Sequence, residues 1–201
     1  MSAERMDVRV LDSLPEGYLP ILKVDFKRDK KLLWKIENKV FWGSIMLAVI
    51  MHFVVPITTF VTLDYGFLNF LGRLAAALAA CFAYMLLHEL AHGVAMRCMG
   101  GKKVSYGFSI PYAYAGSGDF FGRKSYTVVA LAPVLLFAVL LTVIMLLVPR
   151  QWFWAVWLVQ IFNLTGSVGD YYVTWRFAKL PADILVQDSG VSMTVYSKEK
   201  I

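Results

Sequence analysis

The sequence has 201 residues, of which 59% are hydrophobic and only 17% are charged. A soluble domain of this length is normally much less apolar, so the composition excludes an ordinary soluble globular protein. The formal net charge of +6 does not indicate nucleic-acid binding, because membrane proteins place Lys and Arg beside their membrane-spanning segments. We expect the lipid bilayer as a partner, and no nucleic acid.

The first 39 residues are predicted to form a polar segment with charges throughout. They lack the apolar core that a secretory signal peptide needs, so we expect none. Leu19–Phe26 has the composition of a short strand. Lys30–Lys39 mixes Lys with apolar side chains, which is typical of a helix at the membrane surface. A binding site for anionic lipid or for a protein partner is the alternative interpretation of this basic helix.

Four apolar segments follow, and each is long enough to cross a bilayer as a helix. They span Val40–Leu63, Leu74–Met99, Tyr126–Val148 and Trp152–Trp175. We therefore expect an all-α polytopic membrane protein with four transmembrane helices and small polar termini. The predicted organisation is a cytoplasmic N-terminal segment with a juxtamembrane helix (1–39), a four-span membrane domain (40–175) and a cytoplasmic C-terminal tail (176–201).

A strand-like and a loop-like segment separate the second and third apolar segments. Val104–Ile110 alternates like a strand and ends before Pro111, which predicts a short strand. Tyr112–Phe121 contains Gly116 and Gly118 and is predicted to be a loop. In the C-terminal tail, Val191–Tyr196 is a candidate for one short strand.

The distribution of basic residues predicts an orientation. Lys and Arg number nine in the N-terminal segment, one in the first loop, five in the second, one in the third and four in the tail. Because Lys and Arg are enriched on the cytoplasmic side of membrane proteins, the N terminus, the second loop and the C terminus should be cytoplasmic. The chain is then a multi-pass protein of the cytoplasmic membrane.

Residues 88–92, inside the second apolar segment, read H-E-L-A-H. Two histidines four residues apart lie on one face of a helix, so His88 and His92 can bind one metal ion. Glu89 can then take a proton from a water molecule at that metal. A Glu inside a membrane span costs about 3 kcal/mol, which argues that it has a function. We predict His88 and His92 as metal ligands and Glu89 as the catalytic residue.

Asp170 is the predicted third ligand. It is the only other acidic residue inside a predicted span, and at about 1.5 Å per residue it lies at the same depth as His92. Two histidines and one carboxylate leave a fourth position open, which is the pattern of a catalytic zinc site. Asn163, on the same helix face as Asp170, is predicted to bind the substrate backbone or a developing oxyanion. The alternative is that this polar face only makes hydrogen bonds between helices.

Several other residues in the apolar segments have simpler interpretations. His52 is expected to make an interhelical hydrogen bond rather than to bind a metal. Cys81 and Cys98 lie about 25 Å apart on one predicted helix, so they cannot pair and are expected to be free thiols. Pro133 should free the Val129 carbonyl and kink the third span, which either shapes helix packing or opens room beside the metal.

Together these motifs resemble those of intramembrane metalloproteases of the site-2 protease type. The resemblance includes H-E-x-x-H, the Ala132-Pro133 pair and the segment N-L-T-G-S-V-G-D at 163–170. The chain is most similar to a bacterial family of uncharacterised membrane zincin peptidases, over most of its length. By that resemblance His88, His92 and Asp170 would bind Zn²⁺, and Glu89 would be catalytic.

The resemblance implies a zinc-dependent intramembrane peptidase that hydrolyses peptide bonds of membrane-associated substrates near the cytoplasmic face. The substrate would be a membrane protein or peptide. One alternative is a membrane metallohydrolase with a non-peptide substrate, and another is a non-catalytic, metal-binding membrane scaffold. The sequence leaves the oligomeric state open.

Overall fold

The computed structural model describes residues 9–24, 30–109, 112–190 and 192–198. The chain folds into two compact units. The first unit consists of Met1–Lys30, His88–Pro133 and Asp170–Ile201. The second unit consists of Lys31–Leu87 and Val134–Gly169.

Helices and strands alternate along the described residues. The helices are α1 (Lys30–Val54), α2 (Thr58–Val61), α3 (Phe67–Cys98), α4 (Arg123–Leu147), α5 (Arg150–Gly166) and α6 (Val168–Phe177). The strands are β1 (Val10–Leu11), β2 (Leu19–Val24), β3 (Val104–Ser109), β4 (Tyr112–Ser117), β5 (Phe120–Gly122), β6 (Leu185–Asp188) and β7 (Met193–Ser197). Helices α3 and α4 contribute residues to both units.

The expectation of an all-α protein with four transmembrane helices is wrong, because the fold is mixed α/β with seven strands in two sheets over the described residues. Of the helices in those residues, only α3 and α4 are long and apolar enough to cross a membrane. The predicted first span is interrupted because Pro56 has no amide N–H and disfavours helical backbone at Val55. Helix α1 therefore ends at Val54.

The predicted fourth span is divided between α5 and α6 at Ser167, the C-cap of α5. Gly166 is a poor helix former, and the Ser167 hydroxyl donates to the Asn163 carbonyl at 2.8 Å, which competes with the backbone ladder. Helix α5 has 17 residues, or about 25 Å of length, which is shorter than the hydrocarbon core of a bilayer.

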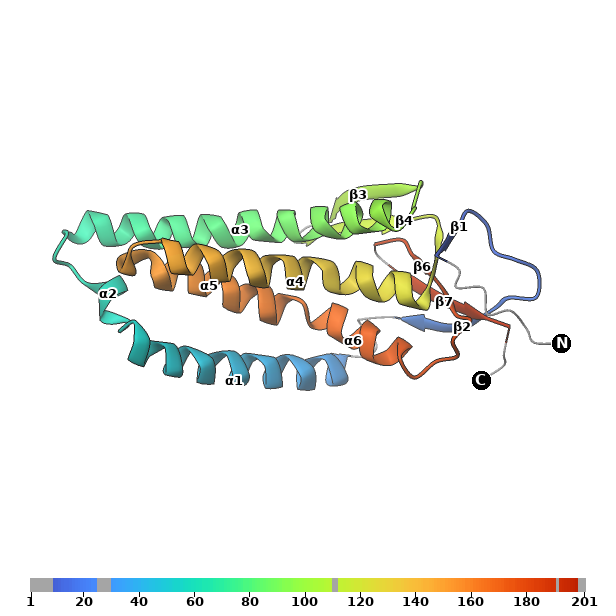
Figure 1. Cartoon of the computed structure of the whole chain (residues 1–201), viewed down its shortest axis with the longest axis horizontal. Coiled ribbons are helices and arrows are strands. Elements are labelled where there is room, and N and C mark those ends of the chain that lie inside the picture. Colours follow the sequence, from blue (N-terminus) through green and yellow to red (C-terminus); the bar gives the residue numbers. More distant parts are fainter. Residues whose placement is uncertain (1–8, 25–29, 110–111, 191, 199–201) are drawn as a thin grey trace. The chain divides into compact units, whose positions relative to one another are not determined.

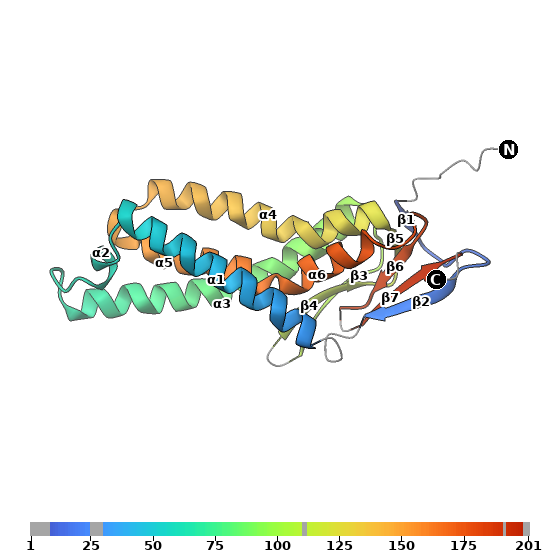
Figure 2. The same ribbon diagram turned by 90° about the horizontal axis from the view of Figure 1, so that it is seen from below.

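The larger sheet belongs to the first unit and has the antiparallel order β1-β5-β6-β7-β2. Figures 1 and 2 show β2, β6 and β7 side by side. The strand predicted at Leu19–Phe26 is confirmed as β2, although Asp25 and Phe26 lie outside the described residues. The strand predicted at Val191–Tyr196 is confirmed as β7, and Val191 likewise lies outside them.

The smaller sheet is the antiparallel hairpin β3–β4, also in the first unit. The strand predicted at Val104–Ile110 is confirmed as β3, with Ile110 outside the described residues. The loop predicted at Tyr112–Phe121 is wrong, because this stretch contains β4 and most of β5. Gly116 does not mark a loop: a Cβ there would lie 2.3 Å from the Ser189 backbone, so glycine allows a close approach.

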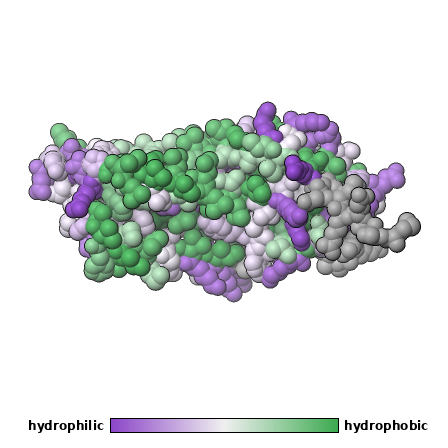
Figure 3. Space-filling model, in the orientation of Figure 1, coloured by the Kyte–Doolittle hydropathy of each residue, from purple (hydrophilic) through white to green (hydrophobic). Residues whose placement is uncertain are grey.

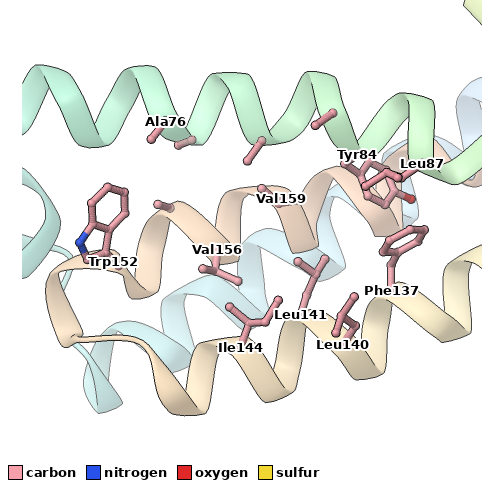
Figure 4. Close-up of a pocket in the computed structure, with 14 residues that line it drawn as sticks. Ala76, Tyr84, Leu87, Phe137, Leu140, Leu141, Ile144, Trp152, Val156 and Val159 are labelled. Carbon is pink, nitrogen blue, oxygen red and sulfur yellow. The ribbon is translucent and has the colours of Figure 1, made fainter.

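The second unit is helical and contains an apolar cavity of about 420 Å³ between α3, α4 and α5. In Figure 4, Tyr84, Leu87 and Phe137 lie toward one end of this cavity and Trp152 toward the other. None of the residues predicted to bind metal lines the cavity. The cavity is therefore a feature of helix packing in the second unit and not the place of the predicted chemistry.

The other candidates in the apolar segments have simple structural roles. His52 Nδ1 accepts a hydrogen bond from the Ile57 amide at 3.1 Å, so it caps the break in the helix after α1. Cys81 and Cys98 are free thiols, as predicted.

Candidate metal centre

Helix α3 places the H-E-x-x-H residues in the first unit. The ligand atoms of His88, Glu89 and His92 all lie within 4.8 Å of one another. The helix continues past them to Cys98, and the turn after it is closed by hydrogen bonds from the Gly100 and Gly101 amides to the carbonyls of residues 97 and 96. Gly100 has φ of 107°, a left-handed conformation that glycine adopts without strain.

Asp170 joins the two histidines from the first turn of α6. Its carboxylate oxygens lie 3.3 Å from His88 Nε2 and 3.3 Å from His92 Nε2. The two Nε2 atoms lie 3.1 Å from each other. Three residues that were predicted as ligands thus converge on one point, and the break at Ser167 begins the helix that carries the carboxylate.

These distances fit a zinc ion. Ligands at about 2.0–2.1 Å in a tetrahedral arrangement are about 3.3 Å from one another. The two Nε2 atoms are 3.1 Å apart, and each lies 3.3 Å from a different oxygen of Asp170: His88 from Oδ2 and His92 from Oδ1. These separations are close to that edge length. The donor set, two imidazoles and one carboxylate, is one that zinc prefers.

The second nitrogen of His92 has a partner as well. His92 Nδ1 lies 3.0 Å from the Val129 carbonyl oxygen on α4. A carbonyl can only accept, so Nδ1 carries the proton and donates it. In the neutral imidazole, Nε2 then has a free lone pair directed at Asp170 and His88. This is the tautomer that a metal ligand needs.

Glu89 is bonded to the smaller sheet. Its Oε2 accepts a hydrogen bond from the Ala115 amide of β4 at 2.9 Å. Ala115 is 5% exposed, so this contact is sheltered from water. The sequence contained no signal for it, because the donor is a backbone group in a segment predicted to be a loop.

Tyr126 and Asp188 form a further buried pair that sequence reasoning missed. The Tyr126 hydroxyl donates to Asp188 at 2.5 Å, and the Gly190 amide donates to the same carboxylate at 2.8 Å. Burial raises the pKa of Asp188, although both hydrogen bonds oppose this shift. Asp188 also interacts electrostatically with His92 and Asp170. No motif marked Asp188, because it lies in the polar tail.

Asn163 is not part of this cluster. It lies in the second unit, fully buried, where its Oδ1 accepts from the Tyr84 hydroxyl at 2.7 Å. Its Nδ2 donates to the Val134 carbonyl at 3.2 Å. Both ends of the amide are therefore engaged in helix packing, and its predicted role toward substrate stays a prediction.

Asp119 anchors the segment that leads from α3 into the smaller sheet. Its Oδ2 accepts hydrogen bonds from the Lys102 and Lys103 amides at 2.7 and 2.8 Å and from the Ser117 hydroxyl at 3.0 Å. Burial opposes ionisation of Asp119, but the hydrogen bonds from Lys103, Lys102 and Ser117 outweigh it, and its pKa is lowered. The charged form of this carboxylate therefore stabilises the fold beside the H-E-x-x-H helix.

We expect Asp119→Ala to lower the free energy of unfolding by about 2–3 kcal/mol at neutral pH, because it leaves two amides without acceptors. Since the folded-state pKa lies below the usual 3.8, this contribution is complete above that value and is lost as the pH falls through the folded-state pKa. Unfolding of variant and wild type should therefore converge in acid. Asp12→Asn, which removes only an exposed ion pair to Lys102, is the control and should change stability little.

Comparison with known proteins places these residues in a family. A family model described as "Putative zincin peptidase" matches residues 81–185, about half of the chain. The matched region contains His88, Glu89, His92 and Asp170. The resemblance to site-2 proteases in particular stays a prediction.

One similar protein is an uncharacterised 24.7 kDa protein from the gap 5′ region of Pyrococcus woesei. It is 31% identical over 114 residues, which are 54% of this chain and 49% of that protein. The chain thus aligns with about half the length of this relative. No solved structure matches the chain. On the family match, the chain belongs to the putative zincin peptidases.

Proposed function

We propose that the protein is a zinc-dependent peptidase that hydrolyses peptide bonds of membrane-associated substrates. The observation that supports this proposal is the convergence of two imidazoles and one carboxylate: His88 Nε2 and His92 Nε2 lie 3.1 Å apart, and each lies 3.3 Å from an oxygen of Asp170. Three protein ligands leave one coordination position for a reactant, which distinguishes a catalytic site from a structural one.

His88, His92 and Asp170 would hold the zinc ion, which would supply Lewis acidity, lowering the pKa of a bound water toward about 7 and polarising a carbonyl. Glu89 is the general base: it takes the proton from the attacking water and later returns it to the leaving amine. Its carboxylate lies beside both histidines, within the 4.8 Å cluster, which is the position that this role requires.

The hairpin β3–β4 favours an extended peptide as the substrate. The Ala115 amide of β4 points to Glu89 and is not used in pairing with β3. The edge of β4 that carries this amide therefore faces the general base. A peptide added along this edge as a further strand would lie beside Glu89, with its backbone bonded to β4.

The same proposal places α3 and α4 in a membrane. Both are long and apolar enough to cross one. Large apolar side chains on these two helices are exposed: Leu68 of α3 by 82%, and Leu146 and Leu147 of α4 by 80% and 79%. Figure 3 shows hydrophobic side chains gathered on the molecular surface in this view. Exposed apolar surface of this kind favours a lipid environment over water.

The basic residues suggest which helix ends face the cytoplasm. The segment from the end of α3 to the start of α4 carries Arg97, Lys102, Lys103, Arg123 and Lys124. The opposite helix ends have only Arg73 and Arg150 nearby. By the enrichment of Lys and Arg on the cytoplasmic side, we place the H-E-x-x-H half of α3 toward the cytoplasm, together with both chain termini.

The test is hydrolysis by the detergent-purified protein loaded with zinc. A mixture of synthetic peptides and a parallel set of non-peptide amides and esters are incubated with it, and products are identified by mass spectrometry. We expect peptide cleavage that a chelator stops and added zinc restores. Cleavage of the non-peptide set alone would mean that the protein is a metallohydrolase of non-peptide substrates and not a peptidase. Bound zinc without any hydrolysis would indicate a non-catalytic metal protein, and failure to bind zinc would overturn the proposal.

A further inference from the structure

Pro133 interrupts the hydrogen-bond ladder of α4 one turn after Val129. In a regular helix the Val129 carbonyl would accept the amide N–H of residue 133. That residue is proline, which has no N–H to donate. The Val129 carbonyl is therefore left without its intrahelical partner, and Val129 is only 1% exposed, so water does not replace that partner.

His92 takes the place of the missing donor. The imidazole Nδ1 lies 3.0 Å from the Val129 carbonyl oxygen. Two other carbonyls of α4 accept a side-chain hydrogen bond: Arg123 from the Thr127 hydroxyl and Ala138 from the Thr142 hydroxyl. In both cases the residue four positions later is a threonine, which has a backbone N–H. Among the described residues of α4, the carbonyl that a proline deprives of its intrahelical donor is the one that bonds to His92.

We propose that Pro133 is a positioning residue for the metal centre. By withholding an N–H, it reserves the Val129 carbonyl for His92, and that carbonyl fixes His92 with its proton on Nδ1. Nε2 is then the nitrogen left to bind a metal, and it lies 3.1 Å from His88 Nε2 and 3.3 Å from Asp170. This inference rests on the proposed zinc site, and it gives a reason for a proline inside a helix, where proline is strongly disfavoured relative to alanine.

The inference gives a specific expectation for Pro133→Ala. The new amide competes for the Val129 carbonyl, so His92 loses part of its hydrogen bond and samples both tautomers. Outer-sphere partners of metal-bound histidine typically contribute 10–100-fold to metal affinity, and we expect zinc to bind about 10-fold more weakly. The variant should fold, because alanine is the better helix former. Pro149→Ala is the matched control, since Pro149 precedes α5 in the second unit.

Two readouts test the proposal without any substrate. Zinc affinity is measured by competition with a chelator, and the tautomer of His92, that is, which ring nitrogen binds zinc and which carries the proton, is read from ¹⁵N chemical shifts in the zinc-bound protein. Weaker zinc binding and a mixture of His92 tautomers in Pro133→Ala, with neither change in Pro149→Ala, support the role. Wild-type affinity and an unchanged tautomer in Pro133→Ala would overturn it. If the wild type itself fails to bind zinc, the proposed function fails, which is a separate result.

Discussion

Replacing Glu89 by glutamine should lower turnover strongly while leaving zinc in place. The amide cannot accept a proton at neutral pH, and a positioned general base contributes about 10²–10⁴-fold to rate, so we expect kcat to fall by that factor. The glutamine side chain retains an oxygen that can accept from the Ala115 amide, so the contact between α3 and β4 should persist. The zinc affinity, set by His88, His92 and Asp170, should change by less than a few-fold.

The separation between chemistry and binding is the informative part of this experiment. Zinc content and kcat are measured on the same preparations of wild type, Glu89→Gln and Glu37→Gln. Glu37 is an exposed residue of α1, so its variant controls for the loss of a carboxylate as such and should retain full activity. Undiminished peptide hydrolysis by zinc-loaded Glu89→Gln would remove Glu89 from the mechanism.

The metal cluster could be predicted from the sequence because its geometry is largely local. His88 and His92 share a helix face through the helical period alone. The depth of Asp170 is predictable if the helices run along the membrane normal, and the structure brings its carboxylate within 3.3 Å of both histidines. The break at Ser167 does not change this predicted depth. The depth is counted from Asp170 to the C-terminal end of the span, and Ser167 lies before Asp170.

The fold class could not be predicted in the same way. The mean hydropathy of a 24-residue segment is insensitive to single helix-breaking residues. Pro56 and the Gly166-Ser167 pair each end a helix within an otherwise apolar segment. Strand β5, within a stretch predicted to be a loop, could not be predicted for a different reason. β5 pairs with β1 and β6 across long sequence separations, and such pairing leaves no local periodicity to read.

The contacts of the site also differ in whether they follow from local sequence or depend on long-range pairing. The freed Val129 carbonyl was predictable, since a proline four residues later removes its donor by covalent structure. The Ala115 amide was not, because its direction depends on the register of β4 against β3. For Asn163 the prediction assumes one continuous helix from Asn163 to Asp170, whereas α5 ends before Ser167 and the Asn163 amide bonds to Tyr84 and the Val134 carbonyl.

Asp170→Asn should remove most of the stabilisation that zinc confers on the protein. An amide oxygen is a weaker zinc ligand than a carboxylate, and loss of an inner-sphere ligand should exceed the 10–100-fold effect of outer-sphere partners, so we expect the Kd for zinc to rise more than about 100-fold. At a zinc concentration of about 100 times the wild-type Kd, zinc stabilises the wild type by about 2.7 kcal/mol. At the same concentration it should stabilise Asp170→Asn by at most about 0.4 kcal/mol.

Thermal unfolding with and without zinc measures this difference independently of any substrate. Asparagine keeps the volume of Asp170, so the metal-free variant should still fold. Asp64→Asn, at an exposed position between α2 and α3, is the matched control and should show the full zinc-induced increase in Tm. An equal increase in Asp170→Asn would mean that zinc binds without this carboxylate. The convergence of Asp170 on the histidines would then be an ion pair, and the third ligand would have to be sought among the other carboxylates near His92, of which Asp188 is the first candidate.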